Sequence, residues 1–301
     1  MDIPLPDHAR DAIRQTFGRR RLDAVEPIGG GLSGSGAFRL ELDGRRYLLK
    51  IERPADGFND PARQFACLAP AAEAGLAPRL RYADPASGVA ISDFLESRPL
   101  DEHPGGRAGL LAAMGDLIRR LQALPPFPPL VEFPHGVGLL LVRAAASGGL
   151  TADQHAQAIA RLDDLVPRLD WGGGGLVASH NDLNPRNILF DGERLWLVDW
   201  ETAFLNDPFT DSAILANFFA RDPAETEVLT SAWLGRTPTA GERERLGWVR
   251  QLCRLYYAAL LIASAGVEPQ AAGPATAEGP DLETAQGRLA YGLRILGETS
   301  D

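Results

Sequence analysis

Residues 179–201 of this chain read SHNDLNPRNILFDGERLWLVDWE. Two short apolar runs in this stretch, Ile188–Phe190 and Leu195–Val198, flank Asp191-Gly192, a dipeptide typical of tight hairpin turns. The stretch therefore predicts a short β-hairpin bordered on both sides by polar residues. The sequence around it reads as helices, so this hairpin is an isolated β-like island in the second half of the chain.

The polar residues around the predicted hairpin suit phosphoryl transfer. The pattern His-x-Asp-x-x-x-x-Asn, at His180, Asp182 and Asn187, has a chance on the order of one in a hundred of arising by accident. Phosphoryl transfer spreads negative charge over oxygens, so a protein mainly positions groups and neutralises charge. Magnesium prefers hard oxygen ligands, which Asn187 and Asp199 can supply. Asp182 can orient an acceptor hydroxyl and take its proton.

Lys50 stands out by composition. Thirty of the 301 residues are lysine or arginine, and Lys50 is the only lysine among them. Arginine is a planar fork, whereas the lysine ammonium is a compact point charge, so the two are not interchangeable where a narrow site meets a phosphate end-on. The sequence predicts that Lys50 contacts a phosphate. The alternative is that this single lysine was retained by chance.

A glycine-rich stretch precedes Lys50 along the chain. Residues 29–36 read GGGLSGSG between two predicted strands. Its Gly-x-Gly-x-x-Gly pattern is weak by itself and is also typical of a flexible hairpin tip. In this context, backbone N–H groups without Cβ crowding can approach phosphates, and serine hydroxyls add donors. The candidate phosphate-binding residues of the loop are Gly31, Ser33, Gly34 and Ser35.

The distribution of predicted elements indicates an α+β fold with two lobes. The first hundred residues predict a small antiparallel sheet, with strands at 24–28, 37–42, 46–51, 79–83 and 89–94 and helices at 6–17 and 60–74. Later helices are expected at 110–124, 151–169, 209–220, 223–233, 240–265 and 282–297. Segments 125–134 and 266–280 read as loops. We place the lobe boundary between residues 94 and 95, giving lobes 1–94 and 95–301.

These motifs resemble those of the protein-kinase-like fold. The kinase catalytic-loop pattern His-Arg-Asp-Leu-x-x-x-Asn matches at His180, Asp182, Leu183 and Asn187 and differs at Asn181. The kinase Asp-Phe-Gly motif is replaced by the tripeptide Asp-Trp-Glu that begins at residue 199. Within this fold, the chain is similar to the aminoglycoside phosphotransferase and choline kinase superfamily, whose members carry His-(Gly/Asn)-Asp-x-x-x-x-Asn followed by Asp-x-(Glu/Asp).

The resemblance implies a role for each matched residue. Asp182 would be the catalytic base, Asn187 and Asp199 the Mg²⁺ ligands, and Lys50 the partner of the ATP α- and β-phosphates. His180 and the buried carboxylate Asp211 would support the catalytic loop. Adenine would lie against the connector backbone, at Ser92 and Phe94. The helix after the lysine strand presents Gln64 where the family has a glutamate, and Glu73 is another candidate partner for Lys50.

The acceptor is expected to be a small molecule with a hydroxyl group, possibly cationic. Aromatic residues and Glu201 gather in the second half of the chain, and aromatic faces beside a carboxylate suit amines; core packing is the alternative for these rings. The candidate substrate residues are Glu201, Trp200 and Asn184. We favour an acceptor of the choline, ethanolamine or thiamine type, with an aminoglycoside as runner-up. A nucleotide-binding pseudokinase is the alternative of another class.

The bulk composition argues against several other classes. The formal net charge is -10, and a chain with this charge and no Lys/Arg stripe is a poor candidate for binding nucleic acid or an anionic membrane. Cys67 and Cys253 lie in apolar surroundings and read as buried thiols, which favours a cytoplasmic setting. We expect neither a signal peptide nor a spanning helix, and no obligate protein partner is inferred.

Overall fold

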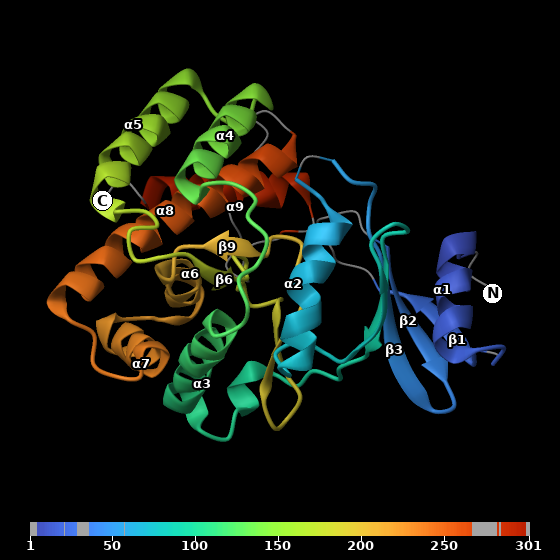
Figure 1. Ribbon diagram of the computed structural model, residues 1–301. Coiled ribbons are helices and arrows are strands. Elements are labelled where there is room, and N and C mark those ends of the chain that lie inside the picture. Colours follow the sequence, from blue (N-terminus) through green and yellow to red (C-terminus); the bar gives the residue numbers. More distant parts are fainter. Residues whose placement is uncertain are drawn as a thin grey trace. The chain divides into compact units, whose positions relative to one another are not determined.

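The computed structural model describes residues 5–20, 22–28, 36–56, 58–266, 282 and 284–298 (Figure 1). The predicted phosphate-binding residues Gly31, Ser33, Gly34 and Ser35 lie outside these ranges, so their role stays a prediction. The chain divides into two compact units. Unit 1 comprises Met1–Leu130, Val177–Leu205 and Arg221–Arg236, and unit 2 comprises Val131–Leu176, Asn206–Ala220 and Thr237–Asp301. The lobe boundary at residue 94 also stays a prediction.

Unit 1 contains a five-stranded antiparallel sheet in the order β1-β2-β3-β5-β4. Its strands are β1 (Ala24–Pro27), β2 (Gly36–Leu42), β3 (Arg45–Ile51), β4 (Leu80–Asp84) and β5 (Val89–Asp93). Asp43 and Gly44 form the β2–β3 turn with φ values of 51° and 69°, the left-handed conformation that such a turn requires. Lys50 pairs with Ala37 on β2 and Ala90 on β5, so it lies on the central strand.

The two faces of this sheet are covered by different helices. Helix α1 (Asp7–Phe17) packs Ala12 and Ile13 against Tyr47 and Leu49 of β3. Because side chains alternate along a strand, residues 48, 50 and 52 point the other way, where helix α2 (Pro61–Glu73) lies (Figure 1). Asp60 caps α2 by accepting from the N–H of Ala62. Lys50 is therefore directed to the side of the sheet that α2 covers.

The predicted hairpin is present in unit 1. Strands β7 (Ile188–Phe190) and β8 (Leu195–Leu197) pair with Ile188 opposite Leu197. A second short pair joins β6 (Val177–Ser179) to β9 (Phe204–Asn206), and β9 is a strand that the sequence did not predict. The N–H of Leu197 donates to the carbonyl of Leu76, which ties the hairpin to the segment after α2 at 2.8 Å.

Helices complete unit 1 on the far side of this hairpin segment. Helix α3 (Gly106–Gln122) follows a short 3-10 turn (Leu100–Glu102) and packs against helix α7 (Pro223–Leu234). Gly115 permits the close approach of the two helices, because a Cβ at this position would come within 2.3 Å of the carbonyl oxygen of Leu229. The α3–α7 pair thus depends on a missing side chain.

Unit 2 is a helical bundle around one long helix. Helix α8 (Ala240–Ala265) contacts α4 (Phe133–Ala146), α5 (Ala152–Leu169), α6 (Phe209–Phe219) and α9 (Ala285–Glu298). Thr239 and Thr151 begin α8 and α5 with reciprocal side-chain caps. The described residues include no helix that is long and apolar enough to cross a membrane.

The α+β fold class predicted from the sequence is confirmed, with one helix missed. Helix α4 begins at Phe133, inside the segment that was expected to be a loop, and runs to Ala146. Pro134 lies in its first turn, where proline is tolerated, whereas Gly136 and Gly138 lower helix propensity, so packing against α5 and α8 stabilises it instead. Cys67 and Cys253 are free and buried, as expected.

Candidate active site

The hairpin brings Asn187 and Asp199 together. Asn187 immediately precedes β7, and Asp199 is the second residue after β8, so both flank the same end of the antiparallel pair. The N–H of Val198 donates to the carbonyl of Asn187 at 3.1 Å and closes this end. Asp199 has a φ of 66°, a conformation that only a few non-glycine residues adopt and that is often found at functional sites.

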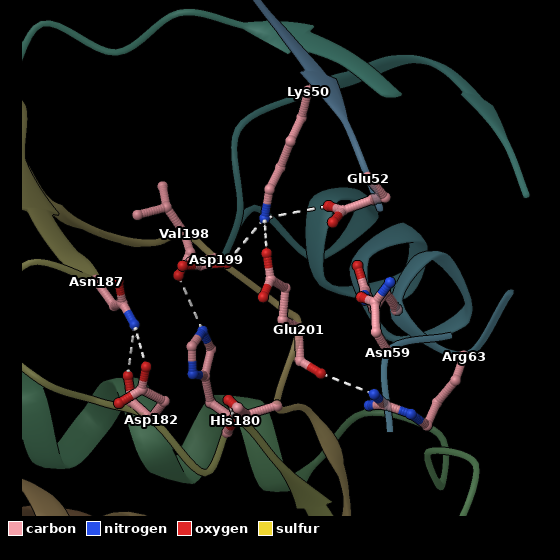
Figure 2. A network of polar contacts seen from close by, with 12 residues as sticks. Lys50, Glu52, Asn59, Arg63, His180, Asp182, Asn187, Val198, Asp199 and Glu201 are labelled. Atoms are coloured by element: carbon pink, nitrogen blue, oxygen red, sulfur yellow. Dashed lines mark hydrogen bonds and ion pairs between the residues drawn. The ribbon is translucent and has the colours of Figure 1, made fainter. Parts of the chain in front are cut away.

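Two amide side chains hold the carboxylate of Asp182. Asn184 donates to Oδ1 at 2.9 Å. Asn187 donates to Oδ2 at 2.8 Å and to the Asp182 carbonyl at 2.8 Å (Figure 2). The Asn184 amide oxygen accepts from the N–H of Arg186 at 2.8 Å. Asn184, which was expected to contact the substrate, therefore orients Asp182 within the loop, and both ends of its amide serve that purpose.

His180 fastens the loop to the segment after the hairpin. Its ring is fully buried, its Nε2 lies 3.1 Å from the carbonyl oxygen of Val198, and its own carbonyl accepts from the hydroxyl of Thr202 at 3.1 Å. Asn181 adds a bond from its amide to the carbonyl of Thr202 at 3.0 Å. These contacts fit a supporting role for His180.

Lys50 lies at the centre of a cluster of carboxylates. Its Nζ is 2.8 Å from Asp199, 3.0 Å from Glu201 and 3.1 Å from Glu52 (Figure 2). Burial of the ammonium works against its charged form, but these three carboxylates outweigh that effect and hold the pKa of Lys50 above its usual range. Three negative charges against one positive charge leave two in excess, so the cluster favours a further cation.

The partner of Lys50 is not the one expected from the sequence. Gln64 donates to Asn59 at 2.7 Å, and Glu73 is the last residue of α2, whereas Glu52 takes part directly. Glu52 was not predicted as the partner of Lys50, although its position carried a signal, because residues two apart on a strand point to the same side. Arg63 was also missed; it is buried and donates to the carbonyls of Glu201 and Ala203.

Asn187 and Asp199 fit a magnesium ion. Both hydrogen bonds that Asn187 donates use its amide nitrogen, which turns that nitrogen to Asp182 and leaves the amide oxygen for a cation. Magnesium in kinases binds through one or two such ligands together with substrate phosphates. A dedicated metal cage of three or more His, Cys, Asp or Glu residues is not found among the described residues. Asn187 and Asp199 offer two protein oxygens, a number that suits Mg²⁺ bound together with phosphates.

The two connector residues, Ser92 and Phe94, make different contacts. Ser92 on β5 is 9% exposed and lines a partly open pocket of about 60 Å³, together with Lys50 and residues of α2. The N–H of Phe94 donates to the carbonyl of Arg46 at 3.1 Å, which extends the sheet by one bond. A contact of either residue with adenine stays a prediction.

Trp200 and Glu201 make contacts within the protein, and their predicted contacts with the substrate stay predictions. Trp200 is 4% exposed and packs its ring on His180 and Phe127, so it offers little surface to an acceptor. Glu201 turns to Lys50 and is 16% exposed at its side chain. The nearby aromatic residues Phe204 and Trp233 are buried as well, which favours core packing.

Asp211 belongs to unit 2. Its side chain is fully buried in the first turn of α6, and Thr210 and Ser212 beside it are fully buried too. Tyr256 and Tyr257 on α8 are also buried within unit 2. The predicted support of the catalytic loop by Asp211 stays a prediction.

Comparison with known proteins agrees with the motifs. The model of the phosphotransferase enzyme family matches residues 24–248. Among solved structures, a choline/ethanolamine kinase family protein from Mesorhizobium loti superposes with a TM-score of 0.71 at 22% identity over 98% of this chain and 96% of that chain. Choline kinase LicA from Streptococcus pneumoniae gives 0.68 at 16% identity, covering 96% and 97%.

Structures of antibiotic-modifying enzymes are similar in fold too. Spectinomycin phosphotransferase APH(9)-Ia, in complex with ADP and spectinomycin, has a TM-score of 0.67 at 11% identity, with 99% of both chains covered. A curated relative, Protein LicA of Haemophilus influenzae, is 50% identical over 36 residues, but this match spans only 12% of this chain and 14% of that protein. The chain has the kinase-like fold and belongs to the phosphotransferase enzyme family.

Proposed function

We propose that this phosphotransferase uses ATP to phosphorylate a hydroxyl group of a small molecule. The observation that carries the proposal is the carboxylate of Asp182, which two asparagine amides hold at 2.9 and 2.8 Å. The carbonyl of Asn187 accepts from the N–H of Val198, the residue before Asp199, and Asp199 contacts Lys50 at 2.8 Å. A base, two metal-ligand candidates and a phosphate-binding cation thus form one continuous network within unit 1.

Each member of this network has a distinct task. Lys50 binds the α- and β-phosphates of ATP, and its raised pKa keeps it protonated throughout the neutral range. Asn187 and Asp199 hold Mg²⁺, which when bound neutralises the charge of the phosphates. Asp182 orients the acceptor hydroxyl and accepts its proton while the hydroxyl oxygen bonds to the γ-phosphorus and ADP leaves.

The acceptor that we favour is an amino alcohol of the choline, ethanolamine or thiamine type. Two of the similar structures are named as a choline/ethanolamine kinase family protein and a choline kinase, which supports this acceptor class. An aminoglycoside or related antibiotic is the second candidate, supported by the likeness to a spectinomycin phosphotransferase.

A substrate panel distinguishes the two acceptor classes. ADP release is measured with MgATP and, in turn, choline, ethanolamine, thiamine, kanamycin and spectinomycin. We expect turnover on at least one of the first three compounds. Turnover on an antibiotic with none on the amino alcohols would overturn our first choice and leave the phosphotransferase assignment intact.

A protein that binds nucleotide without transferring phosphate is the alternative of another class. Asp182→Ala separates the two, because loss of a general base lowers kcat by about a hundredfold or more. Glu193→Ala, at an exposed position in the β7–β8 turn, is the matched control and should behave as wild type. Equal background rates in wild type and Asp182→Ala would favour the non-catalytic alternative.

A further inference from the structure

Helix α2 offers Lys50 no nearby acid. Its one acidic residue, Glu73, is at its last position. Gln64 donates its amide to Asn59 at 2.7 Å, and Asn59 in turn donates to the carbonyls of Arg53 and Pro54 at 2.8 and 3.2 Å. The polar side chains at this end of α2 therefore hold the loop that leads into the helix, and the partner of Lys50 comes from elsewhere.

Glu52 is built into the strand that carries Lys50. It follows the last residue of β3, and its N–H donates to the carbonyl of Gly88 at 2.8 Å, which continues the pairing of Ile51 with Val89. Residues two apart on a strand point to the same side. The Glu52 carboxylate accordingly lies beside Lys50, with Oε1 at 3.1 Å from Nζ (Figure 2).

Burial distinguishes Glu52 from the other two carboxylates. Its side chain is 2% exposed, against 42% for Asp199 and 16% for Glu201. An accessible carboxylate can turn to an incoming cation, whereas an enclosed one that lost its partner would be left as an unpaired buried charge. Glu52 is the most enclosed of the three carboxylates and therefore the one least able to leave Lys50 for an incoming cation.

We propose that Glu52 is the positioning residue for Lys50, and that it supplies from the strand the carboxylate that related kinases take from the helix. The proposal rests on the proposed function only for the contact between Lys50 and a nucleotide phosphate. Because lysine and glutamate share one strand, their spacing does not depend on where α2 lies. Arg63 anchors α2 separately, through the carbonyl of Glu201 at 2.8 Å and that of Ala203.

Nucleotide binding tests this role without relying on turnover. The affinities of MgADP and of adenosine are measured by calorimetry for wild type, Glu52→Gln and the control Glu73→Gln. We expect Glu52→Gln to bind MgADP about tenfold more weakly and adenosine unchanged, because adenosine lacks the phosphates that Lys50 contacts. Glu73→Gln should match wild type for both ligands. Unchanged MgADP affinity, or equal losses for MgADP and adenosine, would overturn the proposal.

The composition of the chain supplies a second, independent readout. Lys50 is the only lysine, so protein grown with ¹³Cε-labelled lysine gives one side-chain signal in an NMR spectrum. We expect this signal to shift in Glu52→Gln and to stay in place in Glu73→Gln. If wild type did not bind MgADP, the proposed function would fall, and an unmoved signal in Glu52→Gln would separately overturn the pairing. If Glu52→Gln does not fold, Glu52→Asp replaces it, because aspartate retains the charge. The same selective loss of MgADP affinity is expected, because the aspartate side chain is one methylene shorter and its carboxylate lies farther from Lys50.

Discussion

Each unit contains a cluster of charged side chains, and the two clusters differ in charge balance and in exposure to solvent. Around Lys50, three carboxylates face one ammonium, and their exposure rises from 2% at Glu52 to 42% at Asp199. In unit 2, the fully buried carboxylate of Asp207 meets the guanidinium of Arg245, one charge against one. The first cluster has two negative charges in excess and is partly open to solvent, whereas the second is balanced and largely closed.

The difference is the one expected between the proposed nucleotide site and a structural ion pair. Asp207 has its remaining needs met locally, because Oδ1 accepts from the N–H of Phe209 at 3.0 Å and Arg245 stacks on the Phe209 ring at 4.9 Å. The excess charge around Lys50, in contrast, is costly until a cation joins it, which is the arrangement expected of a site that binds a metal-nucleotide complex.

Lys50→Arg is expected to have the largest effect on activity. The charge is conserved, but the planar guanidinium cannot take the place of a compact ammonium among Asp199, Glu201 and Glu52 and still meet a phosphate end-on. We expect kcat/KM to fall by about a thousandfold, the scale at which one charge-stabilising donor contributes to catalysis. The reverse exchange Arg45→Lys, at an exposed position of the same strand, is the control. Near-normal turnover in Lys50→Arg would contradict the role given to Lys50.

Arg245→Met should lower the free energy of unfolding, whereas Lys50→Arg should lower activity. Removing one partner of a buried pair costs about 3 kcal/mol, because the Asp207 carboxylate is left ionised without compensation. Urea unfolding at pH 7 measures the loss, with circular dichroism as the check on folding.

The loss in Arg245→Met should shrink as the pH falls. Burial raises the pKa of Asp207 above its ordinary value of 3.8, against the opposing effects of the Phe209 N–H and Arg245. On acidification the folded state therefore takes up this proton before the unfolded chain does, and uptake by the folded state adds stability. Without Arg245 this effect is larger, so the variant approaches wild type between pH 7 and pH 5. An equal loss at both pH values would argue against an ionised, uncompensated Asp207.

Asp199→Asn should show the opposite pattern to Arg245→Met. Asparagine tolerates the φ of 66° at this position, so the backbone is retained, and one of the crowded carboxylates becomes neutral. We expect no loss in the free energy of unfolding, but an affinity for ADP in the presence of Mg²⁺ that is weaker by about tenfold or more. Calorimetric titrations with Mg²⁺ and with EDTA make the comparison. A variant that loses affinity equally in both would show that Asp199 acts without the metal.

Features encoded by local pattern were predictable from the sequence. Alternation and the turn at Asp43-Gly44 defined the strands around Lys50, and the hairpin from Ile188 to Leu197 followed from the same rules. The spacing of Asp182 and Asn187 directed attention to the loop that the structure shows as one hydrogen-bonded unit.

Features that depend on distant contacts were not predictable. Arg63 donates to carbonyls some 140 positions away, and no local pattern records such bonds. The sequence allows Trp200 to be a ligand contact or part of the core, and its 4% exposure, which favours core packing, depends on contacts that no local pattern records. Glu52 is different: its position two residues after Lys50 was visible, but the resemblance to kinases directed the search for an acid to the following helix.

Arg20→Ala should have the smallest effect and sets the baseline for the comparison. Arg20 and Asp43 form an ion pair at 3.1 Å in which both side chains are 68% exposed. Water and salt screen such a pair, and fixing two flexible side chains opposes its formation, so removal should change the free energy of unfolding by less than about 0.5 kcal/mol. Urea unfolding at low and high salt measures this, and activity should stay at the wild-type level. If Arg20→Ala lowered the free energy of unfolding as much as Arg245→Met, burial would not explain why the enclosed pair stabilises the fold more than the surface pair.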